Sequence, residues 1–244
     1  MHAIVLAGQM NQGPLKEVSP SIYEAEISVA GRPMVDYVVD AVKGLNGIEK
    51  IVLVGPEPIQ REGTILAPVG EDLISNLLSG IRTLNASNAP VLVVTADIPL
   101  ITTSVLEEFL AQAPQNVDVV YPIIEKELTQ SAYPTTKRTY VRLRDGSFTG
   151  GNIFLINPSK LLEIQDQVKV LLGHRKSPVR LARDIGIRTL VRFALGLLTI
   201  RDAEQRVAKL LNVTGRALVF AHPEVGVDVD KPQDLVLVEQ LLQT

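Results

Sequence analysis

Four short runs of aliphatic and β-branched residues recur in the first half of the chain, each separated from the next by a longer segment. Apolar residues stand next to one another in these runs instead of alternating with polar ones, so a strand formed by each run must be covered on both faces. Buried strands of this kind, separated by helices, predict an α/β fold with a mostly parallel sheet and helices on both faces. The runs are Ala3–Ala7, Ile51–Val54, Val91–Val94 and Val117–Tyr121.

The segments between and after these runs carry apolar residues at helical spacing. In the first half, helices are predicted from Pro33 to Leu45, over Asp72–Leu84 and over Thr103–Gln112. Beyond residue 122 the pattern changes, and we interpret residues 1–244 as one domain with a helical insertion at about residues 158–215. The later strands are predicted at Tyr140–Leu143, Ile153–Ile156 and Ala217–Phe220, and the later helices at Pro158–Leu172, Pro178–Leu198, Asp202–Leu211 and Lys231–Leu242.

Composition narrows the class of protein. The 244 residues are 46% hydrophobic and 21% charged, as in an ordinary folded domain, and a net charge of -3 argues against a general coat for nucleic acid. Cysteine is absent, which excludes disulfides, thiolate metal sites and cysteine nucleophiles. The first residues lack the basic region of a signal peptide, and the longest apolar stretch, Phe193–Ile200, is too short to cross a bilayer. We therefore expect a cytoplasmic protein.

The loop after the first run contains small residues and ends in a cation. It begins at Gly8, passes through Gly13 and Pro14, and reaches Lys16. Backbone N–H groups of such a loop can approach a phosphate closely, and a lysine can neutralise it. The spacing is neither that of a dinucleotide-binding glycine motif nor that of a P-loop, so phosphate binding and an ordinary turn both stay open.

A carboxylate follows the third run. Asp97 lies at the end of the strand predicted over Val91–Val94, and Pro99 stiffens the chain just beyond it. Mg²⁺ takes few protein carboxylates together with phosphate oxygens and water, so this position suits a magnesium ligand. The alternative is that Asp97 caps the next helix, but Thr102 and its neighbours already provide suitable capping side chains.

Two more carboxylates lie near the carboxyl terminus of the chain. Asp228 and Asp230 are separated by one residue, so in an extended segment both side chains point the same way. One or both can therefore face the site of Asp97. Asp230 is equally suited to cap the helix predicted from Lys231, and the two roles do not exclude each other.

Five segments follow one another in an order that is specific, although each is weak alone. They are Ile4–Gly8, Gly31–Val35, Asp97–Leu100, Thr149–Asn152 and Asp228–Leu235. In this order they resemble the landmarks of the MobA-like nucleotidyltransferase superfamily, over nearly the whole chain. The resemblance implies a GT-A-type, Rossmann-like sheet. It also implies an enzyme that uses an NTP and Mg²⁺, transfers the NMP group to a phosphorylated or otherwise anionic acceptor, and releases pyrophosphate.

The resemblance assigns roles to particular positions. The residues that would contact the base and ribose of the nucleotide are Leu6, Ala7 and Gly8. Those that would hold the metal are Asp97 and Asp230, assisted by Asp228. Those that would line the acceptor pocket are Thr149, Gly150, Gly151 and Asn152.

Two positions depart from the family pattern. Gln9 stands where a second glycine is usual, and Glu24 stands where the family has a phosphate-binding lysine. A carboxylate at that place repels an NTP unless a metal bridges the two, so an active enzyme needs another cation. We predict Lys16 for this role, with Lys137 or Arg138 as replacements. In the alternative, Lys16 is an exposed loop lysine paired with the glutamate that follows it.

These departures keep two further functions open. One is a relative that binds a nucleotide or a nucleotide-sugar without turnover. The other is a GT-A glycosyltransferase, which shares the sheet and an Asp-x-Asp metal motif. Release of pyrophosphate from an NTP in the presence of an acceptor distinguishes a nucleotidyltransferase from both.

A strongly basic segment lies within the helical insertion. Residues 169–209 hold ten Lys and Arg against three acids, a net charge of +7, and Arg180, Arg188 and Arg192 share one face if the predicted helix around them is continuous. The segment can be a solvated helix face, a cationic lid over a phosphorylated acceptor, or a surface that contacts anionic lipid. Nucleic acid is not expected as a partner because stacking aromatic residues are scarce. Zinc is not expected either, since His174 has no second histidine nearby.

Overall fold

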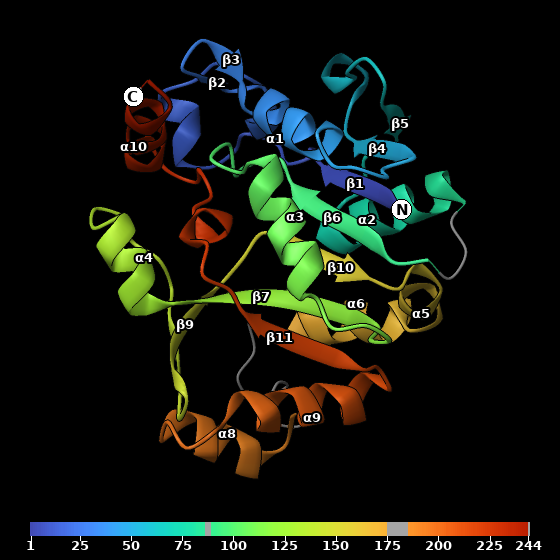
Figure 1. Cartoon of the computed structure of the whole chain (residues 1–244), viewed down its shortest axis with the longest axis vertical. Helices are drawn as coiled ribbons and strands as arrows, with labels where there is room; N and C mark the ends of the chain where they lie inside the picture. Colours follow the sequence, from blue (N-terminus) through green and yellow to red (C-terminus); the bar gives the residue numbers. More distant parts are fainter. Residues whose placement is uncertain (86–88, 175–184, 244) are drawn as a thin grey trace.

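The structure is a computed structural model that describes residues 1–85, 89–174 and 185–243. Within these residues, nine strands form one central sheet (Figure 1). They are β1 (His2–Leu6), β4 (Lys50–Val54), β5 (Ile65–Ala67), β6 (Val91–Thr95), β7 (Val119–Glu125), β8 (Val141–Leu143), β9 (Gly146–Gly150), β10 (Ile153–Ile156) and β11 (Gly215–Val219). Their spatial order is β5-β4-β1-β6-β10-β7-β9-β8, and β11 pairs with β7.

The sheet is parallel in its first half and mixed in its second. β1 lies between β4 and β6 and is parallel to both, with Leu6 in register with Val54 and Thr95. β9 and β10 instead both pair antiparallel with β7, and Gly151 and Asn152 separate the two strands. β10 is also antiparallel to β6. The predicted α/β class and its alternation of strands and helices are therefore confirmed, and the parallel arrangement changes where β10 is inserted.

Helices cover both faces of this sheet, as Figure 1 shows. One hydrophobic core lies under α1 (Met34–Lys43) and α3 (Thr103–Gln112), and a second lies under α2 (Leu73–Leu84) and α5 (Pro158–Glu163). The remaining helices are α4 (Lys126–Ala132), α6 (Gln165–His174), α8 (Ile187–Ala194), α9 (Ile200–Leu211) and α10 (Pro232–Leu242). The shorter elements are the strands β2 (Ser28–Val29) and β3 (Arg32–Pro33) and the 3₁₀ helices η1 (Pro14–Glu17), η2 (Glu24–Glu26), η3 (Glu57–Ile59) and η4 (Pro223–Gly226).

Consecutive residues of β1 enter opposite cores. Ala3 and Val5 belong to the core under α1 and α3, whereas Ile4 and Leu6 belong to the core under α2, and all four side chains are buried. This is the burial on both faces that an uninterrupted apolar run requires. A third, smaller core contains Val229 and packs against α10.

The helix predicted over residues 158–172 is wrong as one element, because the structure divides it into α5 and α6 at Ile164. Ile164 is buried in the core under α2, with φ −102° and ψ 9°. The side chain of Gln165 donates a hydrogen bond of 3.0 Å to the carbonyl of Leu162, which a continuing helix would need for its own backbone. The backbone thus departs from helical geometry at the buried Ile164, between the two helices.

The long helix predicted over residues 178–198 is also interrupted. Gly186, with φ +91°, precedes α8, and Gly196, with φ +65°, follows it, a backbone conformation that favours glycine. The common face predicted for Arg180, Arg188 and Arg192 requires a helix that continues through Gly186, and no helix of the described residues does so. Arg180 itself lies outside the described residues. Arg192 pairs with Asp202 at 2.7 Å instead.

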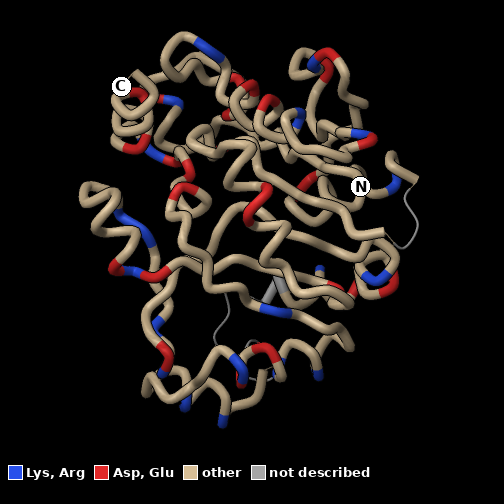
Figure 2. Tube along the Cα trace, viewed as in Figure 1, with Lys and Arg blue, Asp and Glu red and all other residues tan. Residues whose placement is uncertain are grey.

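Figure 2 shows Lys and Arg along α8 and α9, which hold most of the described basic residues of the segment, whereas Lys169 lies in α6. No residue of α8 or α9 lines the candidate site described below. Among the described residues, no helix has the length and apolar composition needed to span a membrane.

Candidate active site

Two backbone hydrogen bonds bring the predicted metal carboxylates together at the carboxyl ends of the central strands. Beyond the end of β6, the N–H of Ala96 donates to the carbonyl of Leu6 at 3.0 Å, and Asp97 follows. The carbonyl of Asp97 then accepts a bond of 2.9 Å from the N–H of Val229. The segment that carries Asp228 and Asp230 is therefore tied directly to the end of β6.

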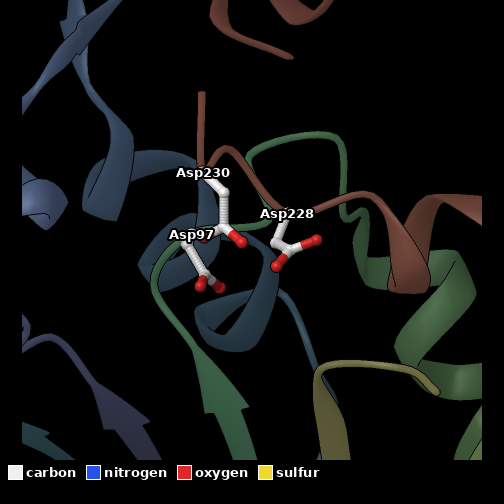
Figure 3. Close-up of side chains that lie close together, drawn as sticks. All are labelled: Asp97, Asp228 and Asp230. Atoms are coloured by element: carbon white, nitrogen blue, oxygen red, sulfur yellow. The ribbon is translucent and has the colours of Figure 1, made fainter. Parts of the chain in front are cut away.

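The predicted spacing of one residue places both C-terminal carboxylates on the same side. Val229 is buried in the core against α10, so the residues on either side of it turn the other way. The carboxylates of Asp97, Asp228 and Asp230 point toward one another, and one oxygen of each lies within 4.8 Å of the others (Figure 3). Three oxygen ligands at such distances fit a hard divalent cation such as Mg²⁺.

Burial and neighbouring negative charges raise the pKa values of Asp97 and Asp228. Burial raises the pKa of Asp97, a hydrogen bond from the Thr95 hydroxyl lowers it in part, and the charge of Asp230 raises it further. Burial and the charge of Asp97 raise the pKa of Asp228 above its usual range. A bound divalent cation would neutralise the charge that the protons otherwise remove, which is a second reason why these residues fit a metal.

Glu24 adds a fourth carboxylate to this neighbourhood. Burial and the charges of Asp230 and Asp97 raise the pKa of Glu24 to about 7. When it is ionised, Glu24 adds a further negative charge beside these aspartates. An anionic ligand at this place would therefore need a cation from another position.

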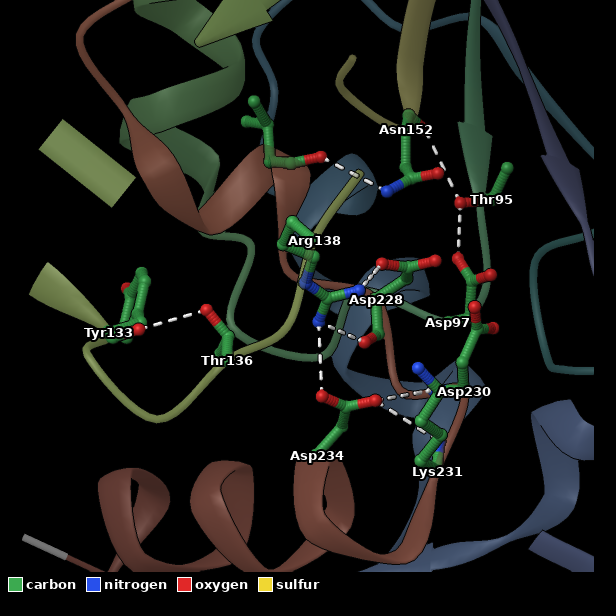
Figure 4. A network of polar contacts seen from close by, with 11 residues as sticks. Thr95, Asp97, Tyr133, Thr136, Arg138, Asn152, Asp228, Asp230, Lys231 and Asp234 are labelled. Carbon is green, nitrogen blue, oxygen red and sulfur yellow. Dashed lines mark hydrogen bonds and ion pairs between the residues drawn. The ribbon is translucent and has the colours of Figure 1, made fainter. Parts of the chain in front are cut away.

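Arg138 is held by carboxylates. Its guanidinium donates to the side chain of Asp228, to the Asp228 carbonyl at 2.6 Å and to Asp234 at 3.4 Å (Figure 4). Asp234 in turn accepts hydrogen bonds from the backbone N–H groups of Asp230, at 3.3 Å, and Lys231, at 3.1 Å. The predicted capping role of Asp230 is wrong, because Lys231 is the N-cap residue of α10 and the side chain of Asp234, in the first turn, bonds the backbone there.

A polar cavity of about 340 Å³ lies beside the carboxylates. Both positively charged and negatively charged side chains line it, together with the turn between β9 and β10. The structure thus brings the predicted acceptor residues, the predicted substitute cations Lys137 and Arg138, and two of the three metal carboxylates around one cavity. The lining residues are Tyr121, Lys137, Arg138, Thr139, Thr149, Gly150, Gly151, Asn152, Gly226, Asp228, Asp230, Lys231 and Asp234.

Hydrogen bonds fix the turn between β9 and β10. The N–H of Gly151 donates to the carbonyl of Pro122 at 2.9 Å, and both the backbone N–H and the side-chain amide of Asn152 donate to the carbonyl of Val225. The carbonyl of Asn152 accepts from the N–H of Thr95 at 3.0 Å. Asn152 therefore connects β6 with the segment that leads to the metal carboxylates.

Tyr121 is a residue of this cavity that the sequence does not indicate. Its ring stacks on Phe154 with centroids 5.2 Å apart, and its hydroxyl occupies the space in which a side chain at position 150 would lie. Gly150 is thus required by the close approach of the tyrosine. The sequence carries no local signal for this contact, because it depends on the pairing of β7 with β9, in which Gly150 is in register with Ile123.

The residues predicted to contact the nucleotide lie at the end of β1. Leu6 and Ala7 are 8% and 1% exposed and their side chains belong to the cores, so neither residue presents much surface to a ligand. A side chain at Gly8 would overlap Val69, which gives this glycine a packing role besides any contact with nucleotide. Lys16 is exposed in η1, and no ion pair within the described chain joins it to Glu17.

A larger cavity, of about 510 Å³, lies between α9 and β11. Its charged lining residues include Arg216 and Glu204, which pair with each other at 3.5 Å, and Asp145, which accepts a hydrogen bond of 2.7 Å from the N–H of Ile200. The lining holds none of the residues that the sequence predicts for the site. Convergence of carboxylates and lysines therefore favours the smaller cavity as the candidate active site.

Comparison with solved structures identifies chains of similar fold. A hypothetical transferase from Thermus thermophilus is 36% identical, with a TM-score of 0.87, and the match covers 96% of this chain and 98% of that chain. A CMP:2-keto-3-deoxy-manno-octonic acid synthetase complexed with CTP is 14% identical, with a TM-score of 0.63, over 99% of this chain and 97% of that chain. A 4-diphosphocytidyl-2C-methyl-D-erythritol synthase from Anaerococcus prevotii is 11% identical, with a TM-score of 0.61, over 100% and 98%.

Sequence comparison gives the family. A bifunctional protein GlmU from Paramagnetospirillum magneticum is 35% identical over 116 residues, which are 45% of this chain and 25% of that protein, so the chain matches about a quarter of this curated relative. The MobA-like NTP transferase domain matches residues 24–190, more than half of the chain. The chain therefore belongs to the MobA-like NTP transferase family and has the nucleotidyltransferase fold.

Proposed function

We propose that this protein is a Mg²⁺-dependent nucleotidyltransferase that moves the NMP group of an NTP to a phosphorylated or otherwise anionic acceptor and releases pyrophosphate. The observation that carries the proposal is the convergence of Asp97, Asp228 and Asp230 beside a cavity that also presents Lys137 and Lys231. Carboxylates suit a metal that neutralises phosphates, and lysines suit an anionic acceptor.

The proposed reaction forms a bond between an acceptor oxygen and the α-phosphorus of the NTP and breaks the bond from that phosphorus to the bridging oxygen of pyrophosphate. Such a transfer depends mainly on positioning and on charge neutralisation. An acceptor oxygen that is already ionised needs no general base, which agrees with the absence of histidine from the described lining of the cavity. A Mg²⁺ ion, held by Asp97, Asp228 and Asp230, would supply neutralisation of the phosphate charge.

The side chains around the cavity have separable roles in this proposal. Lys137 and Lys231 are exposed at the cavity and would attract the acceptor anion. The hydroxyls of Tyr121 and Thr149 would donate hydrogen bonds to it, and the backbone of Gly8 and the cation of Lys16 would serve the nucleotide. Glu24 would lie beside the metal carboxylates, where a bound metal ion would offset its repulsion of the phosphates.

The test is a panel of NTPs offered with phosphorylated and carboxylated acceptors, with pyrophosphate release as the readout. The proposal expects release that requires an NTP, an acceptor and Mg²⁺ and that disappears in Asp97→Asn. Binding of an NTP without release for every acceptor supports the non-catalytic relative instead. Release of a nucleoside diphosphate from a nucleotide-sugar supports a glycosyltransferase.

A further inference from the structure

We propose that Arg138 is a positioning residue of the candidate metal site. It fixes the carboxylate of Asp228, and with it the segment that carries Asp230, in the arrangement that receives a divalent cation. This inference rests on the proposed function and extends it from the three carboxylates to the side chain that holds them in place.

The contacts of the guanidinium are those of a clamp on a single residue. Arg138 donates to the side chain of Asp228 and, at 2.6 Å, to the backbone carbonyl of the same residue. A planar fork that holds both groups restricts the side-chain rotamer and the backbone together, which the ammonium group of a lysine does not do. One oxygen of the Asp228 carboxylate is thereby engaged, and its other oxygen stays available to a cation.

The clamp extends to the second carboxylate of the segment through Asp234. This residue of α10 lies 3.4 Å from the guanidinium and accepts hydrogen bonds from the N–H groups of Asp230 and Lys231 (Figure 4). A displacement of Arg138 therefore affects the backbone of Asp230 as well as the side chain of Asp228. Both C-terminal ligands of the proposed metal depend on one cation.

Arg138 differs from its neighbour in the way it is placed. Its side chain is 7% exposed, and its third donor nitrogen, Nε, makes no hydrogen bond within the described residues. The adjacent Lys137 is exposed at the cavity. The loop between α4 and β8 thus directs one cation toward the protein's own carboxylates and leaves the other facing the cavity.

The direction in which a substitution of Arg138 changes the affinity for a cation distinguishes a positioning role from a purely electrostatic one. Removing a positive charge next to carboxylates strengthens cation binding if electrostatics alone matters. Removing a residue that orients a metal ligand weakens binding, typically by about 10-fold to 100-fold. Arg138→Gln and Arg138→Lys are therefore both expected to weaken binding, because neither preserves the fork.

The experiment measures Mn²⁺ binding to the full-length protein without nucleotide, by electron paramagnetic resonance of the free ion, with Mg²⁺ as competitor. It compares the wild type with Arg138→Gln, Arg138→Lys and a matched control, Arg144→Gln, whose side chain is exposed and outside the site. About a tenfold or greater loss of affinity in both Arg138 variants, with no change in the control, supports the inference.

Two results overturn the inference: wild-type or tighter affinity in Arg138→Gln, and full restoration by Arg138→Lys. Circular dichroism verifies that each variant is folded, and if Arg138→Gln does not fold, Arg138→Lys decides in the same way. Asp97→Asn tests the proposed metal site separately. A wild type that binds Mn²⁺ no better than this variant overturns the metal site and the role of Arg138 together.

Discussion

Single residues at the candidate site carry negative charges that lower the stability of the fold when no cation is bound. Asp97 follows a buried strand, accepts a hydrogen bond from Thr95 and lies within 4.8 Å of two further carboxylates. Buried charges without a partner of opposite sign destabilise a fold. Binding sites often contain such charges, so a residue that favours binding can lower the stability of the free protein. Substitutions at such positions should therefore separate binding from stability.

Asp97→Asn is expected to abolish the increase in Tm that Mg²⁺ and an NTP give the wild type, while the Tm of the metal-free protein at pH 8 stays equal or rises. The amide keeps an oxygen that can accept the Thr95 hydrogen bond and removes a charge that Asp230 repels. Differential scanning fluorimetry with and without Mg²⁺ measures both effects. A metal-free variant that melts well below the wild type would contradict this expectation.

Asp118→Asn is the matched control for that experiment. Asp118 lies away from the site and accepts hydrogen bonds of 2.8 and 2.7 Å from the backbone and hydroxyl of Thr214, which lower its pKa. Its replacement should lower the Tm and leave the response to Mg²⁺ unchanged.

Lys16→Ala is expected to lower kcat/KM by about two orders of magnitude, the scale associated with loss of one electrostatic stabiliser. With Glu24 in place of the family lysine, Lys16 is the cation of the loop that follows β1, and it is exposed. Lys16→Arg should restore activity only in part, because the guanidinium differs in size and geometry. Steady-state assays of pyrophosphate release measure the change, and full activity in Lys16→Ala would transfer the role to Lys137.

Among elements, apolar runs are predictable from sequence and polar elements are not. β1, β4 and β6 each contain a run that only a strand buried on both faces explains. β9 and α4 escape prediction because Gly146–Gly150 has small residues in place of an apolar run and Lys126–Ala132 is mostly polar. Tertiary pairing with β7 determines the first of these, which no local pattern encodes.

The same distinction applies to the site. Asp97 is predictable because it follows a buried parallel strand, and Asp228 with Asp230 because alternate residues of an extended segment share a side. Arg138 and Asp228 are far apart in the chain, and Arg138 lies in a loop that no strand pairing places. The sequence therefore suggests a free cation at position 138, whereas the structure has one paired with Asp228. The prediction that Gly8 contacts the nucleotide likewise did not include its close packing against Val69.

Gly80→Ala tests how closely α2 packs on the sheet. Helix propensity alone predicts that this change stabilises the protein by about 1 kcal/mol. A methyl group at this position would instead lie 2.8 Å from Ile4 and 3.0 Å from Val54, so we expect destabilisation of about 1–3 kcal/mol. Chemical denaturation measures the free energy of unfolding, and Thr83→Ala, half-exposed on the same helix, should be neutral or slightly stabilising.

At the scale of the whole molecule, the candidate site joins parts of the chain that no single element contains. The parallel half of the sheet supplies Asp97, and the inserted antiparallel run supplies Gly150 to Asn152. The segment before α10 supplies Asp228 and Asp230, and η2 supplies Glu24. Because four carboxylates meet where these parts join, the stability of the complete fold should depend on their protonation and on metal.

The metal-free protein is expected to lose stability as the pH rises from about 5 to 8. Burial and neighbouring carboxylates raise the pKa values of Asp97, Asp228 and Glu24, the last to about 7, whereas unfolded carboxyls titrate near 4. Between these values the folded state binds more protons than the unfolded state, so the free energy of unfolding falls with increasing pH. Above the folded pKa values the loss is complete. Mg²⁺ should remove this dependence, because it binds the deprotonated carboxylates and stabilises the fold most at high pH.

Thermal melts between pH 5 and 8, in EDTA and in Mg²⁺, measure the effect. Carboxyls whose pKa is lowered, such as Asp202 at about 2, change stability only below this range. His222 changes it within the range and in the same direction. Burial would lower the pKa of His222, but the hydrogen bonds that its protonated ring donates to Glu108 and Glu224 raise it, so its contribution also disappears as the pH rises. His222→Gln removes that contribution. Because His222 does not contact the proposed metal carboxylates, the difference in Tm between Mg²⁺ and EDTA should still grow with pH in this variant. A difference that is constant from pH 5 to 8 would show that the carboxylates do not bind the metal.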